Sequence, residues 1–329
     1  MGQKDNDITG IDILKARKIL QGVVLRTPLT HSKGLSEACG AEVYVKWENL
    51  QKTGSYKIRG AFYRMNMLTP EERKKGVITI SSGNFAVGVA WAAHMMGVKA
   101  TIVVPEYAAK VKVESCKALG ADVVVHGRDF DEADECFMEM MKKSDKVFVS
   151  GEDELDVYAG NGTVGYEILE DLPDVETMLI PVGCGGLANG ISCWAKIVNP
   201  KIRIIGVQSS AAYTLYECFK AGKMVDVPIP PTICDGLAGR ITQPTLDLAL
   251  KNLDDIVLAE EGELKNAIFW VLKNERQLVE GAAVVGPAAI LQGRIKFRKG
   301  EKVAVVVTGG NIDPEILGLP DRSAGLRTS

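Results

Sequence analysis

The fold and the chemistry of this 329-residue chain are most readily inferred from the segment Lys52-Thr-Gly-Ser-Tyr-Lys-Ile-Arg-Gly60. It places Lys57 between two glycines, where an apolar strand pattern gives way to a helical pattern. Burial there would lower the pKa of the amine, because the charged ammonium is costly to desolvate, and would leave a neutral nucleophile able to form a Schiff base. Most lysines are solvated surface residues, and this segment alone favours that interpretation.

Two further glycine-rich segments each follow a predicted strand and open a predicted helix. In Val77-Ile-Thr-Ile-Ser-Ser-Gly-Asn-Phe-Ala-Val-Gly88, residues 77–80 have a strand pattern, and we expect residues 82–84 to cap the helix that follows. In Met178-Leu-Ile-Pro-Val-Gly-Cys-Gly-Gly-Leu-Ala-Asn-Gly190, the glycines allow several backbone N–H groups to point at one place ahead of a helix, an arrangement that binds phosphate. Together the three segments indicate one pocket.

With these motifs the chain resembles the pyridoxal-phosphate enzymes of the tryptophan-synthase-β fold (fold type II), and among them the serine/threonine dehydratases. The resemblance covers nearly the whole chain and is carried by four motifs in the order of the family. They are Ser55-Tyr-Lys-Ile-Arg-Gly60, Ser81-Ser-Gly-Asn84, Gly183-Cys-Gly-Gly-Leu187 and Val303-Ala-Val-Val-Val-Thr-Gly-Gly-Asn311. Any one of them alone would be weak, but four in order are specific. Within this family the chain most resembles the short catabolic threonine deaminases or a phenylserine-type dehydratase.

The resemblance implies the cofactor pyridoxal 5'-phosphate and a role for each site residue. Lys57 would hold the cofactor as a Schiff base and then remove the substrate α-proton, while the serine matching Ser82 is a second acid/base in related racemases. The other cofactor-binding residues implied are Tyr56, Asn84, Gly183, Cys184, Gly185, Gly186, Leu187, Gly236, Glu280 and Thr308. The substrate-binding residues implied are Ser81, Ser82, Gly83, Asn84 and Phe85.

Three positions depart from the pattern of the family. Cys184 replaces a glycine of the phosphate loop, which is compatible with an ordinary φ, and we expect its thiol to pack rather than to react. Thr308 replaces a Ser or Cys but keeps a neutral hydroxyl for the pyridine nitrogen, so that nitrogen has no reason to be protonated. Gln208 replaces the glutamate of cation-binding members, and we therefore expect no metal site.

The implied reaction is β-elimination of water from an L-β-hydroxy-α-amino acid such as threonine or serine, giving a 2-oxo acid and ammonia. Phe85 and Val87 replace a His and a Gln, which would suit a bulkier apolar substrate such as L-phenylserine. An amino-acid racemase is a lower-ranked alternative. An NAD-dependent dehydrogenase is another, because residues 183–188 fit G-x-G-x-x-A, although Gln208 stands where an acidic residue is expected. A non-enzymatic, two-lobed binding protein is a further alternative.

Strand and helix patterns alternate along the chain and predict an α/β fold with two lobes, each a mostly parallel twisted sheet flanked by helices. The predicted strands are 42–47, 77–80, 100–104, 123–126, 147–150, 178–182, 202–207 and 303–307, and a helix is predicted over 129–143. The resemblance suggests a large cofactor-binding domain (1–49 and 152–329). It suggests that 50–151 form a smaller inserted domain carrying the substrate-carboxylate loop, with the cofactor in the cleft between the two.

Composition limits the partners of the chain. A net charge of −3 argues against nucleic acid or an anionic membrane surface as a partner. No apolar stretch is long enough for a membrane span, and the polar N-terminus lacks a signal core. Seven cysteines without a C-x-x-C pair, and three scattered histidines, favour reduced thiols and no zinc site. We therefore expect a cytoplasmic homo-oligomer, dimer or tetramer, that acts on a small amino acid.

Overall fold

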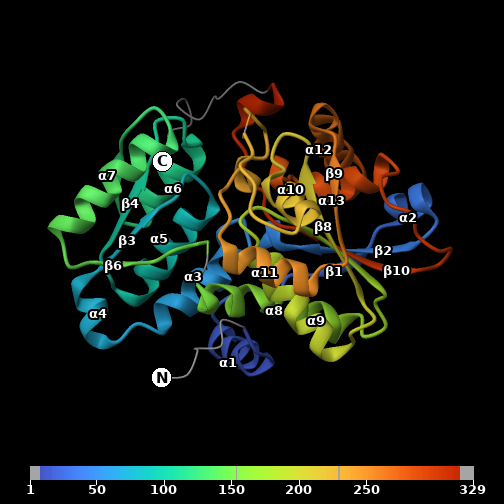
Figure 1. The fold of residues 1–329 in the computed structure, drawn as a ribbon, viewed down its shortest axis with the longest axis horizontal. Coiled ribbons are helices and arrows are strands. Elements are labelled where there is room, and N and C mark those ends of the chain that lie inside the picture. The colour runs from blue at the N-terminus through green and yellow to red at the C-terminus, as the bar shows by residue number, and fades with distance from the viewer. Residues whose placement is uncertain (1–7, 153, 229, 319–329) are drawn as a thin grey trace, which may run out of the picture.

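The computed structural model describes residues 8–152, 154–228 and 230–318, and over these residues the chain forms two β-sheets flanked by helices (Figure 1). The six-stranded sheet has the order β1 (Leu29–His31), β2 (Glu42–Trp47), β10 (Lys302–Val307), β7 (Thr177–Pro181), β8 (Arg203–Ser209) and β9 (Asp255–Ala259). The four-stranded sheet has the order β5 (Asp122–Val125), β4 (Ala100–Val104), β3 (Val77–Ile80) and β6 (Val147–Phe148). All neighbouring strands are parallel except β1, which runs antiparallel to β2.

Thirteen α-helices and three short 3₁₀ turns connect these strands within the described residues. The helices are α1 (Gly10–Leu20), α2 (Lys33–Cys39), α3 (Lys57–Asn66), α4 (Pro70–Lys75), α5 (Asn84–Met96), α6 (Lys110–Ala118), α7 (Phe130–Lys143), α8 (Leu155–Asp171), α9 (Gly186–Val198), α10 (Thr214–Ala221), α11 (Gln243–Asn252), α12 (Glu261–Glu275) and α13 (Gly281–Leu291). The 3₁₀ turns are η1 (Glu48–Leu50), η2 (Asp235–Leu237) and η3 (Pro314–Leu317).

The predicted α/β fold with two mostly parallel sheets is confirmed. Each of the eight predicted strands is present, with ends within two residues of the prediction. The helix predicted over 129–143 is α7, and the Asp129 side chain caps it by accepting a hydrogen bond of 2.9 Å from the backbone N–H of Glu132. Strands β1 and β9 were not predicted. Both lie at the edges of the large sheet. Strand β1 has only three residues, and β9 is only partly buried, so neither gives a clear periodic pattern of apolar residues.

The large lobe, defined as the six-stranded sheet and the helices on it, has apolar side chains on both faces of every central strand. Along β10, Val303, Val305 and Val307 pack with α2, α12 and α13, whereas Ala304 and Val306 pack with α8–α11 on the opposite face. This alternation follows from the two-residue period of a strand. Both faces are covered, as the continuous Val-rich run of β10 predicts for a buried parallel strand.

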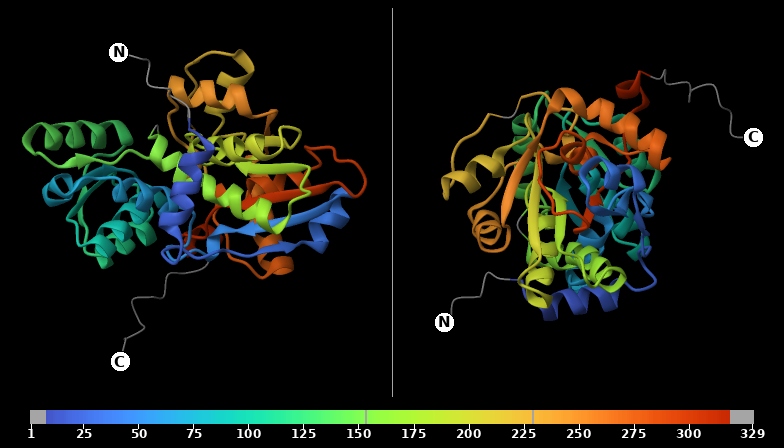
Figure 2. Two further views of the ribbon diagram at one scale, coloured as in Figure 1. Left: turned by 90° about the horizontal axis from the view of Figure 1, so that it is seen from below. Right: turned by 90° about the vertical axis from the view of Figure 1, so that its right-hand side faces the viewer.

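The small lobe, defined as the four-stranded sheet and helices α3–α7, is built in the same way around smaller clusters. Ile102 and Val104 of β4 face α5 and α6, and Val103 faces α7. Figure 2 shows the two lobes side by side, with helices on either side of each sheet. The four strands of the small sheet all fall within 50–151, the segment that we propose as the inserted domain. Among the described residues, no helix is both long and apolar enough to cross a membrane.

A buried network of charges lies where helix α3 meets the large lobe. Arg59, which is fully buried, donates from Nε to Glu48 Oε2 (2.9 Å) and from Nη1 to Glu167 Oε1 (2.7 Å). Lys46, also fully buried, donates to Glu167 Oε2 (2.6 Å) and to the carbonyl oxygen of Thr27 (2.6 Å). Burial raises the pKa of Glu167, but the two cations outweigh this effect and hold the pKa below its ordinary value of 4.5. The stabilisation from Glu167 is therefore present above pH 4.5 and is lost as the pH falls through the lower folded-state pKa.

We expect Arg59→Leu to lower the free energy of unfolding by about 3–5 kcal/mol, because Glu48 and Glu167 would be left buried with too few cations. The matched control is Arg17→Leu, which removes an exposed arginine paired with Glu170 (3.2 Å) and should cost at most about 1 kcal/mol. Urea unfolding measures both values. Equal losses in the two variants would contradict a special role for the buried network.

Candidate active site

The predicted site segments meet at the carboxyl ends of parallel strands from both lobes. The loops after β2, β7 and β10 leave the same edge of the large sheet, and the loop after β3 leaves the corresponding edge of the small sheet. This edge is where open α/β sheets bind ligands. The structure therefore brings together four motifs that are far apart in the sequence.

Lys57 is held in place through the backbone of the residues around it. The Tyr56 N–H donates to the carbonyl oxygen of Thr308 (3.1 Å), and the Gly310 N–H donates to that of Gly54 (2.9 Å). Lys57 follows directly as the first residue of helix α3. The Lys57 segment is thus attached to the end of the central strand β10.

The half-buried ammonium of Lys57 lies 5.2 Å from the ring centre of Tyr56 and 5.8 Å from that of Phe85. Desolvation lowers the pKa of Lys57, but Tyr56, Cys184 and Glu152 favour the charged form and outweigh it, so the pKa lies above its ordinary value. The lowered pKa expected from the sequence is therefore wrong. The sequence segment gives no information on the charged groups that the fold places around the Lys57 amine.

The loop of residues 81–83 leads into helix α5 without a side-chain cap. The helix begins at Asn84 with Gly83 as its N-cap residue, and among the described residues no side chain forms a cap hydrogen bond there. The expectation that residues 82–84 cap this helix is therefore confirmed for Gly83 as the N-cap residue, but the hydrogen bond from a capping side chain is absent. The Gly83 N–H itself donates to Ser81 Oγ (3.3 Å). Free N–H groups at a helix start favour an anion such as a carboxylate.

Asn84 joins the two lobes through its side-chain amide. Its Nδ2 donates to Glu280 Oε1 (2.5 Å), and its Oδ1 accepts from Asn311 Nδ2 (2.8 Å). Asn311 also donates to the carbonyl oxygen of Thr53 (2.8 Å). Glu280 directly precedes helix α13. Thr308 directly follows strand β10 and is buried, at 5% exposure. Asn84, Glu280 and Thr308, which were predicted as site residues, therefore lie on adjoining elements.

The loop of residues 183–187 forms a cradle that fits a phosphate group. Gly185 has φ +88° and precedes helix α9 as an N-cap residue without a side chain, and among the described residues no side chain forms a cap hydrogen bond at this helix start. A Cβ on Gly185 would lie 2.4 Å from Thr245 Cγ2, and one on Gly186 would lie 3.0 Å from the Tyr158 ring. Glycine is favoured at such positions, and the uncapped N–H groups favour a dianion. The donor set therefore suits the phosphate of the expected cofactor.

Cys184 lies within this loop, and Gly236 borders it. Among the described residues Arg276 is the single non-glycine residue with positive φ, so Cys184 has the ordinary φ that its side chain requires. Burial raises the pKa of the Cys184 thiol to about 11, which keeps it protonated at neutral pH and agrees with a packing role. Gly236 approaches the loop closely, since a Cβ on Gly183 would lie 2.9 Å from its carbonyl oxygen.

Phe85 and Val87 are both buried in the small lobe. Phe85 is 4% exposed and packs with Ile58, Val89 and other core residues, and a Cβ on Gly151 would lie 2.9 Å from its ring. Val87 belongs to the apolar cluster that includes Ile102. Phe85 thus has a packing role and, through its contact with Lys57, also borders the site.

Gln208 has a structural role at the end of β8. Its side-chain amide nitrogen, Nε2, donates to the carbonyl oxygen of Val182 (2.9 Å), and its Oε1 accepts from the Tyr216 N–H (2.7 Å). The side chain therefore connects the residue that precedes the phosphate loop to helix α10. Among the described residues, no group of three or more acidic, His or Cys side chains is placed to hold a metal ion.

Lys112 is a residue of this region that the sequence did not single out. It lies on α6, is 2% exposed, bonds the Asp235 carboxylate, and places Nζ 3.2 Å from Glu280 Oε2. Its helix, Lys-Val-Lys-Val-Glu-Ser-Cys-Lys-Ala, has the charges of a solvated surface helix. Its partners are more than 100 residues away in the chain, so no local pattern could have revealed them.

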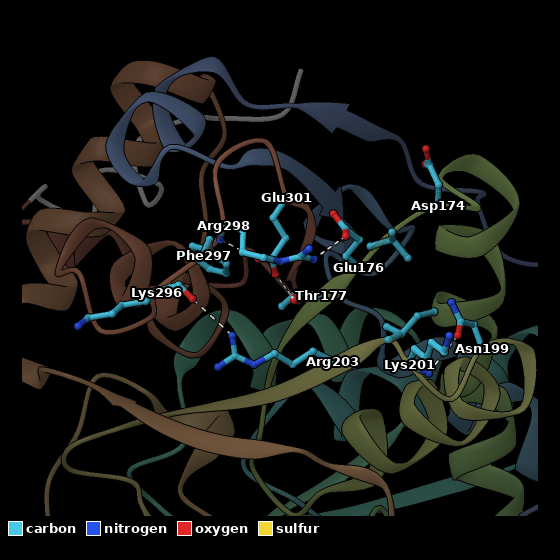
Figure 3. A pocket seen from close by; sticks show the side chains of 12 residues that line it. Asp174, Glu176, Thr177, Asn199, Lys201, Arg203, Lys296, Phe297, Arg298 and Glu301 are labelled. Atoms are coloured by element: carbon cyan, nitrogen blue, oxygen red, sulfur yellow. Dashed lines mark hydrogen bonds and ion pairs between the residues drawn. The ribbon is translucent and has the colours of Figure 1, made fainter.

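A cavity of about 700 Å³ lies at the opposite, amino-terminal edge of the large sheet, near the starts of β7, β8 and β10 (Figure 3). Its charged side chains are partly paired: Arg298 donates to Glu176 (2.6 Å), and Thr177 donates to Glu301 (2.6 Å). None of the predicted site residues lines it. The cavity is therefore separate from the candidate active site.

Comparison with known proteins identifies the family. Residues 20–309 match the family described as pyridoxal-phosphate dependent enzyme. The chain is 44% identical over 313 residues to L-threonine ammonia-lyase of Thermotoga maritima, and the aligned region covers 94% of this chain and 77% of that protein. It is 36% identical over 304 residues to the catabolic L-threonine dehydratase TdcB of Escherichia coli K12, and the aligned region covers 92% of each chain.

The structure of maize serine racemase has a TM-score of 0.90 to this fold, with 30% identity and 95% of each chain covered. These matches leave the NAD-dependent dehydrogenase and the non-enzymatic binding protein without support. They agree with the phosphate cradle and with the position of Lys57 at the strand ends. The chain belongs to the pyridoxal-phosphate-dependent enzymes of the tryptophan-synthase-β fold, in the group of the threonine dehydratases (ammonia-lyases).

Proposed function

We propose that this enzyme deaminates L-threonine, releasing 2-oxobutanoate and ammonia. One water is lost in the β-elimination, and one water is consumed when the released enamine is hydrolysed. The similarity to two threonine ammonia-lyases over more than nine tenths of the chain supports this substrate. The observation that carries the proposal is the attachment of the Lys57 segment to the end of β10, beside a helix start shaped for phosphate. A cytoplasmic location and a homo-oligomeric state stay predictions.

Lys57 is the residue that would bind pyridoxal phosphate and later move the α-proton. When bound, this cofactor supplies an electron-withdrawing ring that makes the α-proton of an amino acid acidic. The amine of Lys57 is then the base within reach of that proton. Its position at the first turn of a helix, fixed through Tyr56 and Thr308, limits where the amine can move.

Two bare helix starts would bind the two anionic groups. The N–H groups of residues 183–187 would bind the phosphate, and those of residues 81–84 would bind the substrate carboxylate. Asn84, Glu280 and Thr308 would contact the ring, with the neutral Thr308 hydroxyl facing its nitrogen. Because a hydroxyl gives that nitrogen no charge to pair with, the arrangement favours expulsion of a β-leaving group.

Two alternatives concern the same site. L-phenylserine is favoured by the apolar Phe85, but the ring of Phe85 is already packed in the small-lobe core, which favours threonine. Racemisation would need Ser82 as an acid/base on the second face of the substrate. The half-buried Ser82 and the similarity to maize serine racemase keep this as a second activity to measure.

Lys57→Ala should lower the release of 2-oxobutanoate from threonine by about 10³-fold or more, because both the attachment point and the base are removed. It should also abolish the visible absorbance of the attached cofactor. The control is Lys52→Ala, which removes a more exposed lysine of the same segment and should leave turnover unchanged. Normal turnover by the Lys57 variant would refute its assignment.

Gly185→Ala should weaken pyridoxal-phosphate binding by about 10- to 100-fold, because a side chain at φ +88° is strained and would press on Thr245. Gly222→Ala is the matched control: Gly222 has φ +65°, ends helix α10 and has open space around it. The Gly222→Ala variant should be less stable than the unmodified enzyme but should bind the cofactor with the same affinity. Titration of each cofactor-free variant measures the affinity, and equal affinities would remove the cradle from the proposal.

Phe85→His combined with Val87→Gln should shift the ratio of kcat/KM for threonine over phenylserine toward threonine by about tenfold, because polar groups disfavour an apolar ring beside them. A coupled assay of ammonia release with both substrates gives the ratio. Chiral analysis of the remaining substrate tests racemisation in the same samples. An unchanged ratio would show that these two positions do not select the substrate.

A further inference from the structure

Lys112 connects the small lobe to the large lobe through buried charges. It lies on helix α6 of the small lobe, whereas its partners Asp235 and Glu280 lie in η2 and immediately before α13 of the large lobe. The Lys112 side chain and that of Glu280 are 2% and 3% exposed, while the side chain of Asp235 is 37% exposed. A lysine is rarely buried unless its charge is compensated, so these contacts stabilise the placement of α6.

The group contains one cation and two carboxylates, which leaves Glu280 with incomplete compensation. Desolvation raises the pKa of Glu280, and the Lys112 ammonium offsets this rise only in part, because Asp235 also bonds Lys112 and repels Glu280. No hydrogen bond among the described residues reaches Glu280 Oε2, the oxygen that faces Lys112. The other oxygen, Oε1, accepts from Asn84. The ammonium of Lys112 therefore helps to determine the charge and orientation of Glu280.

A second contact joins the first turn of α6 to the large lobe. The backbone N–H of Val111 donates to Asp313 Oδ1 (3.2 Å), two residues beyond Asn311. Helix α6 has no side-chain cap of its own, so Asp313 provides the acceptor that the helix start would otherwise take from its own cap. Helix α6 thus contacts the large lobe at two points, one at Glu280 and one close in sequence to Asn311, the two ends of the Glu280–Asn84–Asn311 chain of hydrogen bonds.

We propose that Lys112 is a positioning residue that holds helix α6 against the Asp235 loop and keeps Glu280 oriented toward Asn84. It sets the relative placement of the two lobes at the point where the substrate-carboxylate loop meets the ring-binding residues. Lys112 itself touches neither substrate nor cofactor in this role. The inference rests on the proposed function for its effect on turnover, but not for its effect on helix α6.

Amide hydrogen exchange of helix α6 tests the contact directly, in the enzyme with and without cofactor. In the Lys112→Met variant, the backbone amides of α6 should exchange at least about tenfold faster than in the unmodified enzyme. The matched control is Lys117→Met on the same helix, because Lys117 is exposed and pairs with Glu114 (2.9 Å); its exchange should not change. Should K112M fail to fold, D235N removes the same contact from the large lobe and should give the same acceleration.

Kinetics with threonine distinguishes positioning from a loss of stability. K112M should lower kcat/KM by about 10²-fold, mainly by raising KM, because the carboxylate loop is misplaced. A purely structural role would reduce the amount of active enzyme at an unchanged KM. K112R, which keeps the charge, should restore most of the activity. K112M/E280Q should be more stable to urea than K112M, because no uncompensated buried carboxylate remains.

Two results would overturn the proposal. One is exchange in α6 that is unchanged in both K112M and D235N, and the other is a KM in K112M equal to that of K117M. A failure of the unmodified enzyme to release 2-oxobutanoate would instead refute the proposed function and leave the exchange result valid. The two failures are therefore distinguishable.

Discussion

The structure depends most on the buried charges of Arg59, Glu48, Glu167 and Lys46. Removing four such charges from water is costly, so they are tolerated only when each one is paired and hydrogen-bonded. That requirement fixes the end of β2, the first turn of α3 and the C-terminal part of α8 relative to one another. Arg59 lies two residues after Lys57, so the same requirement also fixes the position of Lys57.

The site uses backbone geometry more than side-chain charge to receive anions. Helices α5 and α9 both begin without a side-chain cap, one at the end of the small sheet and the other at the end of the large sheet. Free N–H groups at a helix start create a partial positive charge without a titratable group. In the proposed function, each lobe supplies one such start, so binding of an amino acid to the attached cofactor connects both lobes.

Much of the fold was predictable because its central strands are continuous apolar runs, such as Val303–Val307, that have few alternative interpretations. The site motifs were predictable because glycine is required where backbone approaches a ligand, as at Gly185. The raised pKa of Lys57, the bare start of α5 and the pairing of Lys112 were not predictable. Each depends on partners that only the tertiary fold brings near, such as Glu280 for Lys112, and local sequence patterns carry no record of those contacts.

The position of β10 in the large sheet has a consequence for synthesis of the chain. Strand β2 pairs with β10, although about 250 residues separate them, which at about 5–20 residues per second take the ribosome roughly 10 to 50 s to add. The strands of the small sheet are contiguous by comparison and emerge together. During translation the small lobe can therefore complete its sheet early, while the N-terminal strands wait with an unpaired edge, a state that chaperones commonly protect from aggregation.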